Sequence, residues 1–445
     1  MIDELRSVGE RVIEKALGMG FDEAAALLHY REASMAKYAN SEPSVIQGWR
    51  ERSVNIYVAK DRRILFTGGS VQSLEDIIGM LEQLRKVAPK VSESMLYAPL
   101  PEPGEVKPLQ GLVDSKVVDL VYDLSPASEA LFEAANRERI DSFAGMFEAA
   151  HEYRVVMTST GVDLAEEGTS IETYIRAFAG EGSGQWSLGS RSYNRENVER
   201  VAETAAHYAV LSRHQEDVEP GEYNIVLSPM VVGDLFNYIV RMASAASVLM
   251  GTSMFAGKKP GEKIASDAVT IYDDARETGL PGSRSFDDEG VPTRRNPVIE
   301  RGVFKTLLHN TKTAAKMGAE STGNAGLLMP RAWNIVVEPG SYSFDELVEE
   351  AGNGFLVTNN WYTRLQNYVE GVFSTITRDA VLIIRDGEIA GAARKFRIAD
   401  SFPRLLKNIA ALGSEVHDIY WWEVRVPTRT PYILARGVKT SKHTG

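Results

Sequence analysis

The segment FDDEGVPTRRNPVIERGVFKTLLHN, residues 286–310, places three carboxylates, Asp287, Asp288 and Glu289, directly before Gly290. An acidic residue followed by glycine is typical of a turn that needs a positive backbone φ angle. Adjacent carboxylates on one strand point to opposite faces, so a metal site would need ligands from elsewhere in the chain. The residues therefore favour a tight turn over a metal-binding cluster or half of an acid–base pair.

The rest of this segment has the pattern of a hairpin that leads into a helix. Residues 300–302, Glu-Arg-Gly, predict a turn joining two short strands. His309 follows the second strand, and Asn310 precedes a predicted helix at 311–317. A lone histidine in such a place is more often a structural residue than a catalytic one.

Composition excludes several classes of function. The 445 residues suffice for roughly two or three domains. A net charge of −12 disfavours direct nucleic-acid binding, because no net basic field would attract phosphates. No apolar run is long enough to span a membrane and the N-terminal stretch does not resemble a signal peptide, so we expect a cytoplasmic protein. The chain has no cysteine, which removes disulfides, thiolate nucleophiles and every zinc site with a sulfur ligand.

The N-terminal half shows the same outline twice. Hydrophobic periodicity predicts a helix, a set of short antiparallel strands and a second helix, first in residues 1–88 and again in 112–218. Five short strands are expected in the first block, at 23–31, 33–40, 44–48, 53–59 and 62–67. Three are expected within 154–192 of the second block, after a helix at 114–137.

These patterns suggest four parts along the chain. A proline-rich crossing, residues 89–111, separates the two N-terminal blocks, and we expect the second block to pack with the first. Pro220-Gly221 marks a probable boundary, after which residues 219–445 are rich in strands. Strands and helices do not alternate regularly, so the fold class is α+β.

The helix predicted at 229–249 is well specified by its own residues. Ser228 is a suitable N-cap and Pro229 suits the first helical position. Its apolar stripe favours a buried core helix. The opposite face carries Asn237, Tyr238 and Met242, with no carboxylate or imidazole among them.

Common catalytic motifs are absent from the sequence. None of the seven histidines has a second histidine four residues away, so there is no HExxH zinc motif. There is no G-x-S-x-G nucleophile elbow. The glycine-rich run at 180–190 lacks the lysine and the strand-to-helix setting of a phosphate loop, and it is interpreted as a hairpin turn.

The run DDEGVPTRRNPVIERGVFKTLLHNTKTAAKMGAESTGNAG, residues 287–326, closely resembles the signature of the TldD/PmbA family. This is the peptidase U62 group, whose members were once described as modulators of DNA gyrase. Residues 35–70, 159–182 and 367–391 also resemble parts of the family, so the resemblance covers most of residues 20–415. It implies an N-terminal α/β portion with antiparallel sheets flanked by helices, and a C-terminal barrel-like β domain.

The family contains two types of subunit. The TldD type is a zinc metalloprotease that carries HExxxH on the helix after the domain boundary and a cysteine near the C-terminus. The TldE type, also called PmbA, lacks these residues and pairs with TldD. Together they digest small or unfolded peptides and mature certain peptide antibiotics.

The resemblance places the metal motif on residues that cannot perform its chemistry. Aligned without gaps through 227–242, the two histidines fall on Asn237 and Met242 and the glutamate falls on Tyr238. The late cysteine falls near residues 421–424, where none is present. The chain therefore resembles the TldE type, and we expect neither a metal nor a cofactor in it, with zinc held by a TldD-like partner.

The resemblance also implies a peptide-binding cleft between paired subunits. The residues expected there are Asp288, Glu289, His309, Asn310, Arg364 and Asn367. The expected substrate is a peptide or unfolded polypeptide, and the expected assembly is a homodimer or heterodimer. Two alternatives remain open: a homodimeric peptide-binding or scaffold protein with no protease partner, and a family peptidase with an unconventional site.

Overall fold

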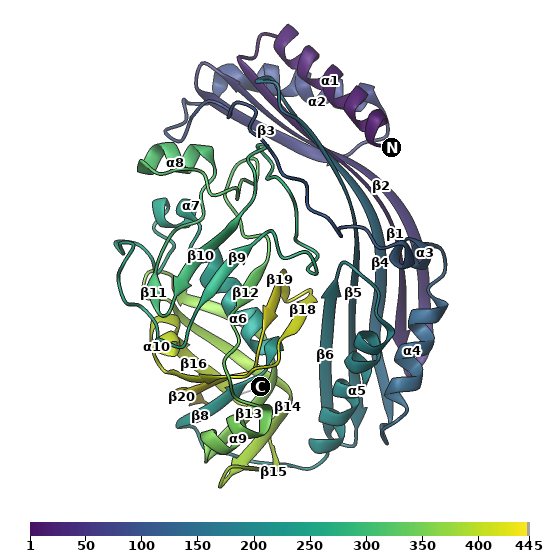
Figure 1. The fold of residues 1–445 in the computed structure, drawn as a ribbon, viewed down its shortest axis with the longest axis vertical. Coiled ribbons are helices and arrows are strands. Elements are labelled where there is room, and N and C mark those ends of the chain that lie inside the picture. The colour runs from purple at the N-terminus through teal and green to yellow at the C-terminus, as the bar shows by residue number, and fades with distance from the viewer. Residues whose placement is uncertain (443–445) are drawn as a thin grey trace.

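One antiparallel sheet of long, curved strands runs through the N-terminal half of the molecule (Figure 1). The computed structural model describes residues 1–442. The sheet has the strand order β3-β2-β1-β4-β5-β6. Its strands are β1 (Glu23–Ala39), β2 (Glu42–Lys60), β3 (Arg63–Ser70), β4 (Ser142–Thr158), β5 (Asp163–Ala179) and β6 (Gly182–Ser190).

The prediction of five short strands in residues 23–67 is wrong, because three long strands occupy this region. The true turns are at Asn40-Ser41 and Asp61-Arg62, where all four residues have positive φ angles. The other apparent breaks are charged residues that remain within the strands as ion pairs. Arg50 Nη2 lies 2.7 Å from Glu32 Oε1, so charges that interrupt the hydrophobic pattern are satisfied across the sheet.

Strands from both N-terminal blocks belong to this single sheet. β1 pairs with β2 along one side and with β4 along the other, with Tyr30 opposite Tyr153. The two similar blocks of the sequence therefore supply two adjacent halves of one sheet. The three strands predicted within 154–192 are confirmed as β4, β5 and β6, although β4 begins earlier, at Ser142.

Five helices cover one face of the sheet. α1 (Ile2–Gly18) and α2 (Leu74–Val87) pack on the face that carries Val155 and Met157 of β4. α3 (Ser115–Tyr122), α4 (Ser125–Ala135) and α5 (Arg195–Leu211) pack around Phe143 and Phe147. Odd-numbered residues of one strand share a face, so all five helices lie on the same side and the other face is left for the C-terminal half.

The C-terminal half contains a closed five-stranded barrel, which confirms the α+β fold class and the barrel-like domain. Strands β13, β8, β20, β16 and β14 follow one another around it, and β14 closes the ring by pairing with β13. Their bounds are β8 (Glu222–Leu227), β13 (Gly354–Asn367), β14 (Val372–Arg385), β16 (Arg397–Ser401) and β20 (Ile433–Ser441). β15 (Glu388–Ala393), β7 (Gln215–Glu216) and β17 (Ile409–Leu412) extend it.

A second sheet lies beside the barrel, and helix α6 (Pro229–Met242) packs between them, against β13 and β19. The sheet order is β11-β10-β9-β12-β19-β18. Its strands are β9 (Ile271–Asp274), β10 (Arg295–Glu300), β11 (Val303–Phe304), β12 (Ile335–Val337), β18 (His417–Trp421) and β19 (Val424–Thr430). The predicted hairpin turn is confirmed at Arg301 and Gly302, which both have positive φ angles.

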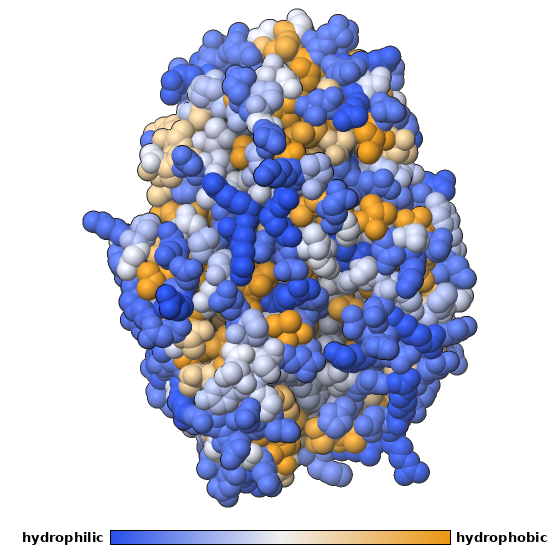
Figure 2. Space-filling model, in the orientation of Figure 1, coloured by the Kyte–Doolittle hydropathy of each residue, from blue (hydrophilic) through white to orange (hydrophobic). Residues whose placement is uncertain are grey.

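Short helices complete the C-terminal half. They are α7 (Ala245–Leu249), α8 (Thr311–Met317), α9 (Phe344–Ala351) and α10 (Phe402–Lys407). The face drawn in Figure 2 is mostly hydrophilic, and its apolar residues lie in small separate groups. Among residues 1–442, no helix has the length and apolar character needed to cross a membrane.

The N-terminal sheet meets the C-terminal half at β5 and β6, through the large apolar cluster that includes Trp421, and also through a smaller apolar cluster on its free face. Phe286 and Leu327 from the C-terminal half pack against residues of the sheet that include Tyr57, Val156 and the nearby Val162. Gly290 approaches Val162 so closely that a Cβ atom there would lie 2.5 Å from Val162 Cγ1. The turn at 287–290 is therefore part of the contact between the two halves.

Gly290→Ala should destabilise the protein for two reasons, a positive φ angle of 83° and the clash with Val162. Gly318→Ala is the matched control, because Gly318 has φ 65° and nothing within 4 Å of the added Cβ. We expect about 1 kcal/mol of lost stability for the control and about 2–4 kcal/mol for Gly290→Ala in denaturant unfolding. Equal losses would show that Val162 does not restrain the turn.

Candidate functional site

Helix α6 begins where the sequence predicts and is almost wholly buried. Ser228 caps it by accepting a hydrogen bond from the Val231 backbone, and Pro229 occupies the first turn. The Ser228 hydroxyl also donates to the carbonyl of Thr358 in β13, at 2.6 Å, which fixes the helix to the barrel. The positions that correspond to HExxxH are therefore held rigidly between β13 and β19.

Asn237 is committed to strand β19 through both atoms of its side-chain amide. Its Nδ2 donates to the carbonyl of Val426 and to Thr428 Oγ1, each at 3.1 Å. Its Oδ1 accepts from the Val426 backbone N–H at 2.8 Å. The amide serves as a clip between helix and strand, and no lone pair is directed at a metal.

Tyr238 and Met242 complete a set of side chains that does not fit zinc. The Tyr238 hydroxyl donates to the carbonyl of Thr363 at 3.1 Å, and Met242 is 2% exposed in the core. Zinc in proteins takes thiolate, imidazole and carboxylate ligands, and none of these groups is present at the three positions. In this structure the three side chains make contacts with neighbouring strands or within the core.

Asp234, one turn before Tyr238, is a buried acid that the sequence analysis missed. Its Oδ2 accepts hydrogen bonds from Asn360 Nδ2 and Thr363 Oγ1, both at 2.5 Å. Burial raises the pKa of Asp234 to about 7, against the opposing effect of these hydrogen bonds. The sequence carried a signal for this residue. Asp234 is the single carboxylate in PMVVGDLF, an apolar stretch that indicates a buried position and not a solvated one.

Asp234 lies beneath a bulge in β13. Three residue steps of β13, from Trp361 to Arg364, are opposite two steps of β14. Tyr362 has a φ angle of 57°, in the left-handed region that a bulky residue rarely adopts. The Glu423 carboxylate accepts a hydrogen bond from the Tyr362 backbone N–H, so the bulge is held from the β18–β19 turn as well as from α6.

The segment DDEG forms the tight turn that the sequence favours. Asp287 Oδ1 accepts from the backbone N–H groups of Glu289 and Val291, and its Oδ2 accepts from Ala325, each at 2.9 Å. The Gly290 N–H donates to the Asp287 carbonyl at 3.2 Å. All three acidic residues are less than 5% exposed, so this is a buried turn and not a surface loop.

Asp288 joins the turn to the N-terminal sheet. Its Oδ1 lies 3.1 Å from Arg154 Nη1 of β4, and its Oδ2 lies 3.2 Å from Arg331 Nη2. Arg154 also donates to the carbonyl of Phe286 at 2.6 Å. A third arginine, Arg284, lies 3.8 Å away, and its burial lowers the pKa of its guanidinium.

Glu289 forms a second buried ion pair, with Lys312 of α8. The Lys312 ammonium donates to Glu289 Oε1, and the Thr311 backbone N–H donates to Oε2 at 3.0 Å. The side chains are 3% exposed for Lys312 and fully buried for Glu289. The ammonium also lies 4.4 Å from the centre of the Tyr57 ring in β2, so this pair too reaches the N-terminal sheet.

His309 and Asn310 organise the start of α8. Asn310 caps the helix in a capping box with Thr313, and its Nδ2 donates to the Leu328 carbonyl at 3.1 Å. The His309 N–H donates to Thr322 Oγ1 at 2.7 Å, and burial lowers the pKa of its imidazole. A neutral buried imidazole is consistent with the structural interpretation of this histidine.

The structure brings together four of the six predicted cleft residues. Asp288, Glu289, His309 and Asn310 surround one buried junction between the turn and α8. Arg364 and Asn367 lie elsewhere, on β13, where Asn367 Oδ1 accepts from the backbone of Val369 and Glu370. Their assignment to a substrate cleft stays a prediction.

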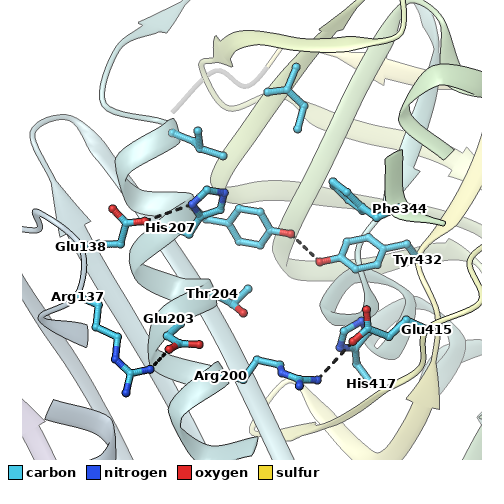
Figure 3. A pocket seen from close by; sticks show the side chains of 13 residues that line it. Arg137, Glu138, Arg200, Glu203, Thr204, His207, Phe344, Glu415, His417 and Tyr432 are labelled. Atoms are coloured by element: carbon cyan, nitrogen blue, oxygen red, sulfur yellow. Dashed lines mark hydrogen bonds and ion pairs between the residues drawn. The ribbon is translucent and has the colours of Figure 1, made fainter. Parts of the chain in front are cut away.

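A cavity of about 550 Å³ lies between α5 and the C-terminal half (Figure 3). Tyr208 and Tyr432 meet in it through their hydroxyl groups, 2.6 Å apart. The charged groups around it are largely paired with each other, as in Arg200–Glu415 at 3.4 Å and His207–Glu138 at 3.5 Å. The cavity therefore supplies no evident catalytic or metal-binding set.

Two family models match the chain over most of its length. Residues 220–442 match the PmbA/TldA metallopeptidase C-terminal domain, and residues 108–213 match the PmbA/TldA metallopeptidase central domain. The chain belongs to the PmbA/TldD family of metallopeptidases.

Individual relatives agree with this assignment. A metalloprotease of Methanocaldococcus jannaschii is 25% identical over 78% of this chain and 79% of its own length. A metalloprotease of Methanothermobacter thermautotrophicus is 30% identical over 65% of this chain and 67% of its own. The crystal structure of TldE from Thermococcus kodakarensis superposes with a TM-score of 0.83 and 25% identity, covering 98% of this chain and all of that one.

Breaking the Glu289–Lys312 pair from one side should cost far more than removing it whole. Glu289→Gln leaves an uncompensated buried ammonium, for which we expect a loss of about 3–5 kcal/mol in unfolding free energy. The double variant Glu289→Leu/Lys312→Met should lose at least ~2 kcal/mol less than the sum of its single changes.

The exposed pair Lys305–Glu300, 2.9 Å apart with side chains 41% and 42% exposed, is the control for this cycle. Glu300→Gln should change stability by less than about 1 kcal/mol. Additive single and double changes at Glu289 and Lys312 would contradict the buried-pair interpretation.

The buried Asp234 should make stability fall as pH rises. Its pKa of about 7 in the folded state lies above the ordinary value of 3.8, so stability is fully present below the ordinary pKa and is lost as pH rises toward 7. Asp234→Asn keeps an acceptor and removes the titration. Relative to the unaltered protein, it should gain about 1–3 kcal/mol between pH 5 and pH 8 in denaturant unfolding.

Asp386→Asn is the control for this titration, because Asp386 is an exposed carboxylate on the β14–β15 turn and its φ of 50° also suits asparagine. This variant should follow the unaltered protein across the whole pH range. Parallel profiles for Asp234→Asn and the unaltered protein would show that Asp234 is ionised throughout.

Proposed function

We propose that this chain is the TldE/PmbA-like, non-catalytic subunit of a two-chain TldD/TldE-type metalloprotease that degrades or matures peptides and unfolded polypeptides. In this proposal a separate TldD-like chain supplies HExxxH, the late cysteine and the zinc. The observation that carries the proposal is the state of α6, where Asn237, Tyr238 and Met242 stand at the motif positions.

The chemistry of these three residues supports a role without metal catalysis. The Asn237 amide is used on both atoms by β19, the Tyr238 hydroxyl is used by β13, and the Met242 thioether lies in the core. A metallopeptidase of this kind needs ligands for zinc and a carboxylate that activates water. In this chain the same helix is used to tie the barrel to the second sheet.

The comparison with TldE from Thermococcus kodakarensis also supports the subunit type. The superposition covers 98% of this chain and all of that one, so the similarity includes the N-terminal sheet as well as the barrel. The relatives named metalloproteases are similar to this chain, but their names do not indicate a subunit type. The proposal therefore takes the subunit type from the residues of α6.

The test is reconstitution with a TldD-type chain, bearing HExxxH, from the same genome. We expect the two chains to co-purify, with zinc bound stoichiometrically to the pair and not to this chain alone. Hydrolysis of an unstructured peptide should require both chains, and replacement of the partner's motif glutamate by glutamine should abolish it.

Two outcomes would overturn the proposal in different directions. Peptide hydrolysis and stoichiometric zinc in this chain alone would make it a peptidase with an unconventional site. A homodimer that binds peptide and ignores the TldD-type chain would make it a binding or scaffold protein.

A further inference from the structure

Four arginines converge on the surface next to the β13 bulge. They are Arg241 at the end of α6, Arg364 on β13, Arg378 on β14 and Arg425 on β19. Burial raises the pKa of the nearby Glu423 carboxyl, and the charges of Arg378, Arg425 and Arg364 oppose that rise. Arg241 lies 4.9 Å from the centre of the Tyr238 ring, and the Tyr238 hydroxyl donates to the carbonyl of Thr363 in the bulge, so Arg241 belongs to the same group.

These arginines form few ion pairs with carboxylates. Within residues 1–442, the guanidinium groups of Arg241, Arg364 and Arg425 form no ion pair with a carboxylate, and the Nε of Arg378 lies 3.8 Å from Asp379 Oδ2. Arg241, Arg364 and Arg425 are exposed. A local cluster of positive charge in a chain with net charge −12 is consequently a distinct feature of this surface.

Aromatic rings hold several of these guanidinium groups in place. Arg364 lies 4.2 Å from the centre of the Tyr362 ring, Arg378 lies 5.6 Å from Trp361, and Arg241 lies 4.9 Å from Tyr238. Trp361 is 40% exposed and Tyr362 49% exposed, with ring centres 6.1 Å apart. A guanidinium stacked on a ring keeps its in-plane N–H groups free to donate, and its side chain is already ordered.

The backbone beneath this surface is strained and anchored. Tyr362 has a left-handed backbone, and such residues persist only where surrounding contacts enforce them. The enforcing contacts are Glu423 on the Tyr362 N–H and the buried Asp234 on Thr363 Oγ1. The result is that two consecutive aromatic side chains of one strand are presented side by side.

We propose that Arg241, Trp361, Tyr362, Arg364, Arg378 and Arg425 form an arginine–aromatic surface that binds carboxylate groups of a peptide. The peptide is the substrate class of the proposed function, and the inference rests on that function for this choice. Planar guanidinium groups bind carboxylates through paired N–H donors, and the rings provide apolar contact for the flanking residue. The carboxylate belongs either to the C-terminus of the peptide or to an aspartate or glutamate side chain.

The charge distribution favours a carboxylate over a nucleic acid. A phosphate backbone requires positive charge repeated along a groove, and its binding surface is basic over many residues. Here three of the arginines, Arg364, Arg378 and Arg425, lie near one carboxylate, Glu423, and the chain as a whole is acidic. A single anionic group with an adjacent apolar or aromatic residue matches this arrangement.

Fluorescence anisotropy with the purified full-length chain tests the inference. The probes are labelled hexapeptides that share one neutral, aromatic-containing sequence and end in a free carboxylate or in an amide. A third probe is the amidated peptide with one internal glutamate. We expect the free-acid peptide, the glutamate peptide or both to bind at least about tenfold more tightly than the neutral amide, with affinity falling as salt is raised.

Arg364→Gln and Arg425→Gln should each weaken that binding at least about fivefold, since each removes an exposed donor. Arg62→Gln is the matched control, because Arg62 is also stacked on a tyrosine, 5.5 Å from the Tyr97 ring, but lies on the β2–β3 turn. It should leave binding unchanged, and circular dichroism and the thermal midpoint should be alike for all three variants.

Preference for either carboxylate position supports the inference and identifies the source of the group. Equal binding of acidic and neutral peptides, insensitivity to Arg364→Gln and Arg425→Gln, or tighter binding of a single-stranded oligonucleotide would each overturn it. The assay needs no protease partner. Carboxylate binding without complex formation would therefore refute the proposed function alone, and complex formation without carboxylate preference would refute this inference alone.

Discussion

The contact between the N-terminal sheet and the segment 286–290 contains a buried turn in which carboxylates, arginines and a lysine neutralise one another. Asp288 forms an ion pair with Arg154 of the sheet. Glu289 forms an ion pair with Lys312, which also contacts the ring of Tyr57. Burying charges is costly unless each is paired and hydrogen-bonded, so this junction tolerates very few alternative geometries. The apolar cluster around Phe286 supplies buried area at this contact, and a larger apolar cluster joins β5, β6 and α5 to α6, β14 and β18.

Helix α6 is also fixed by buried polar contacts with its neighbours, but these contacts are mainly neutral hydrogen bonds and not ion pairs. A helix that in a metallopeptidase must direct ligands at zinc is here linked to its neighbours by neutral hydrogen bonds, from Asn237 to β19 and from Tyr238 to β13. The one acid on its buried face, Asp234, faces amide and hydroxyl groups instead of a cation. In this structure the helix acts as a brace for the β13 bulge, through Asp234 and Tyr238.

That bulge connects the braced interior to the surface. The contacts that stabilise the left-handed Tyr362 from below also determine which aromatic and guanidinium groups are displayed above it. The charges in the 550 Å³ cavity beside α5 are largely paired with one another, whereas within residues 1–442 Arg241, Arg364 and Arg425 form no ion pair with a carboxylate. Unpaired charge, and not cavity size, is therefore the property on which we propose the arginine–aromatic surface as a binding surface.

The sequence by itself determined the local elements: the turn at DDEG, the hairpin at Arg301-Gly302, the cap and apolar stripe of α6, the α+β class, and the family to which the segment 287–326 belongs. These depend on backbone preferences and on residues close together along the chain. Only the tertiary structure showed that charged positions such as Arg50 and Glu32 continue long strands, since each is satisfied by a partner on another strand. It also showed that Asp288 and Glu289 are buried between two halves of the protein, and that Arg241, Arg364, Arg378 and Arg425 share one surface. These groupings join residues as much as 184 positions apart, and no local pattern encodes them, because the N-terminal sheet, helix α6, the barrel strands and β19 of the second sheet meet only in the folded protein.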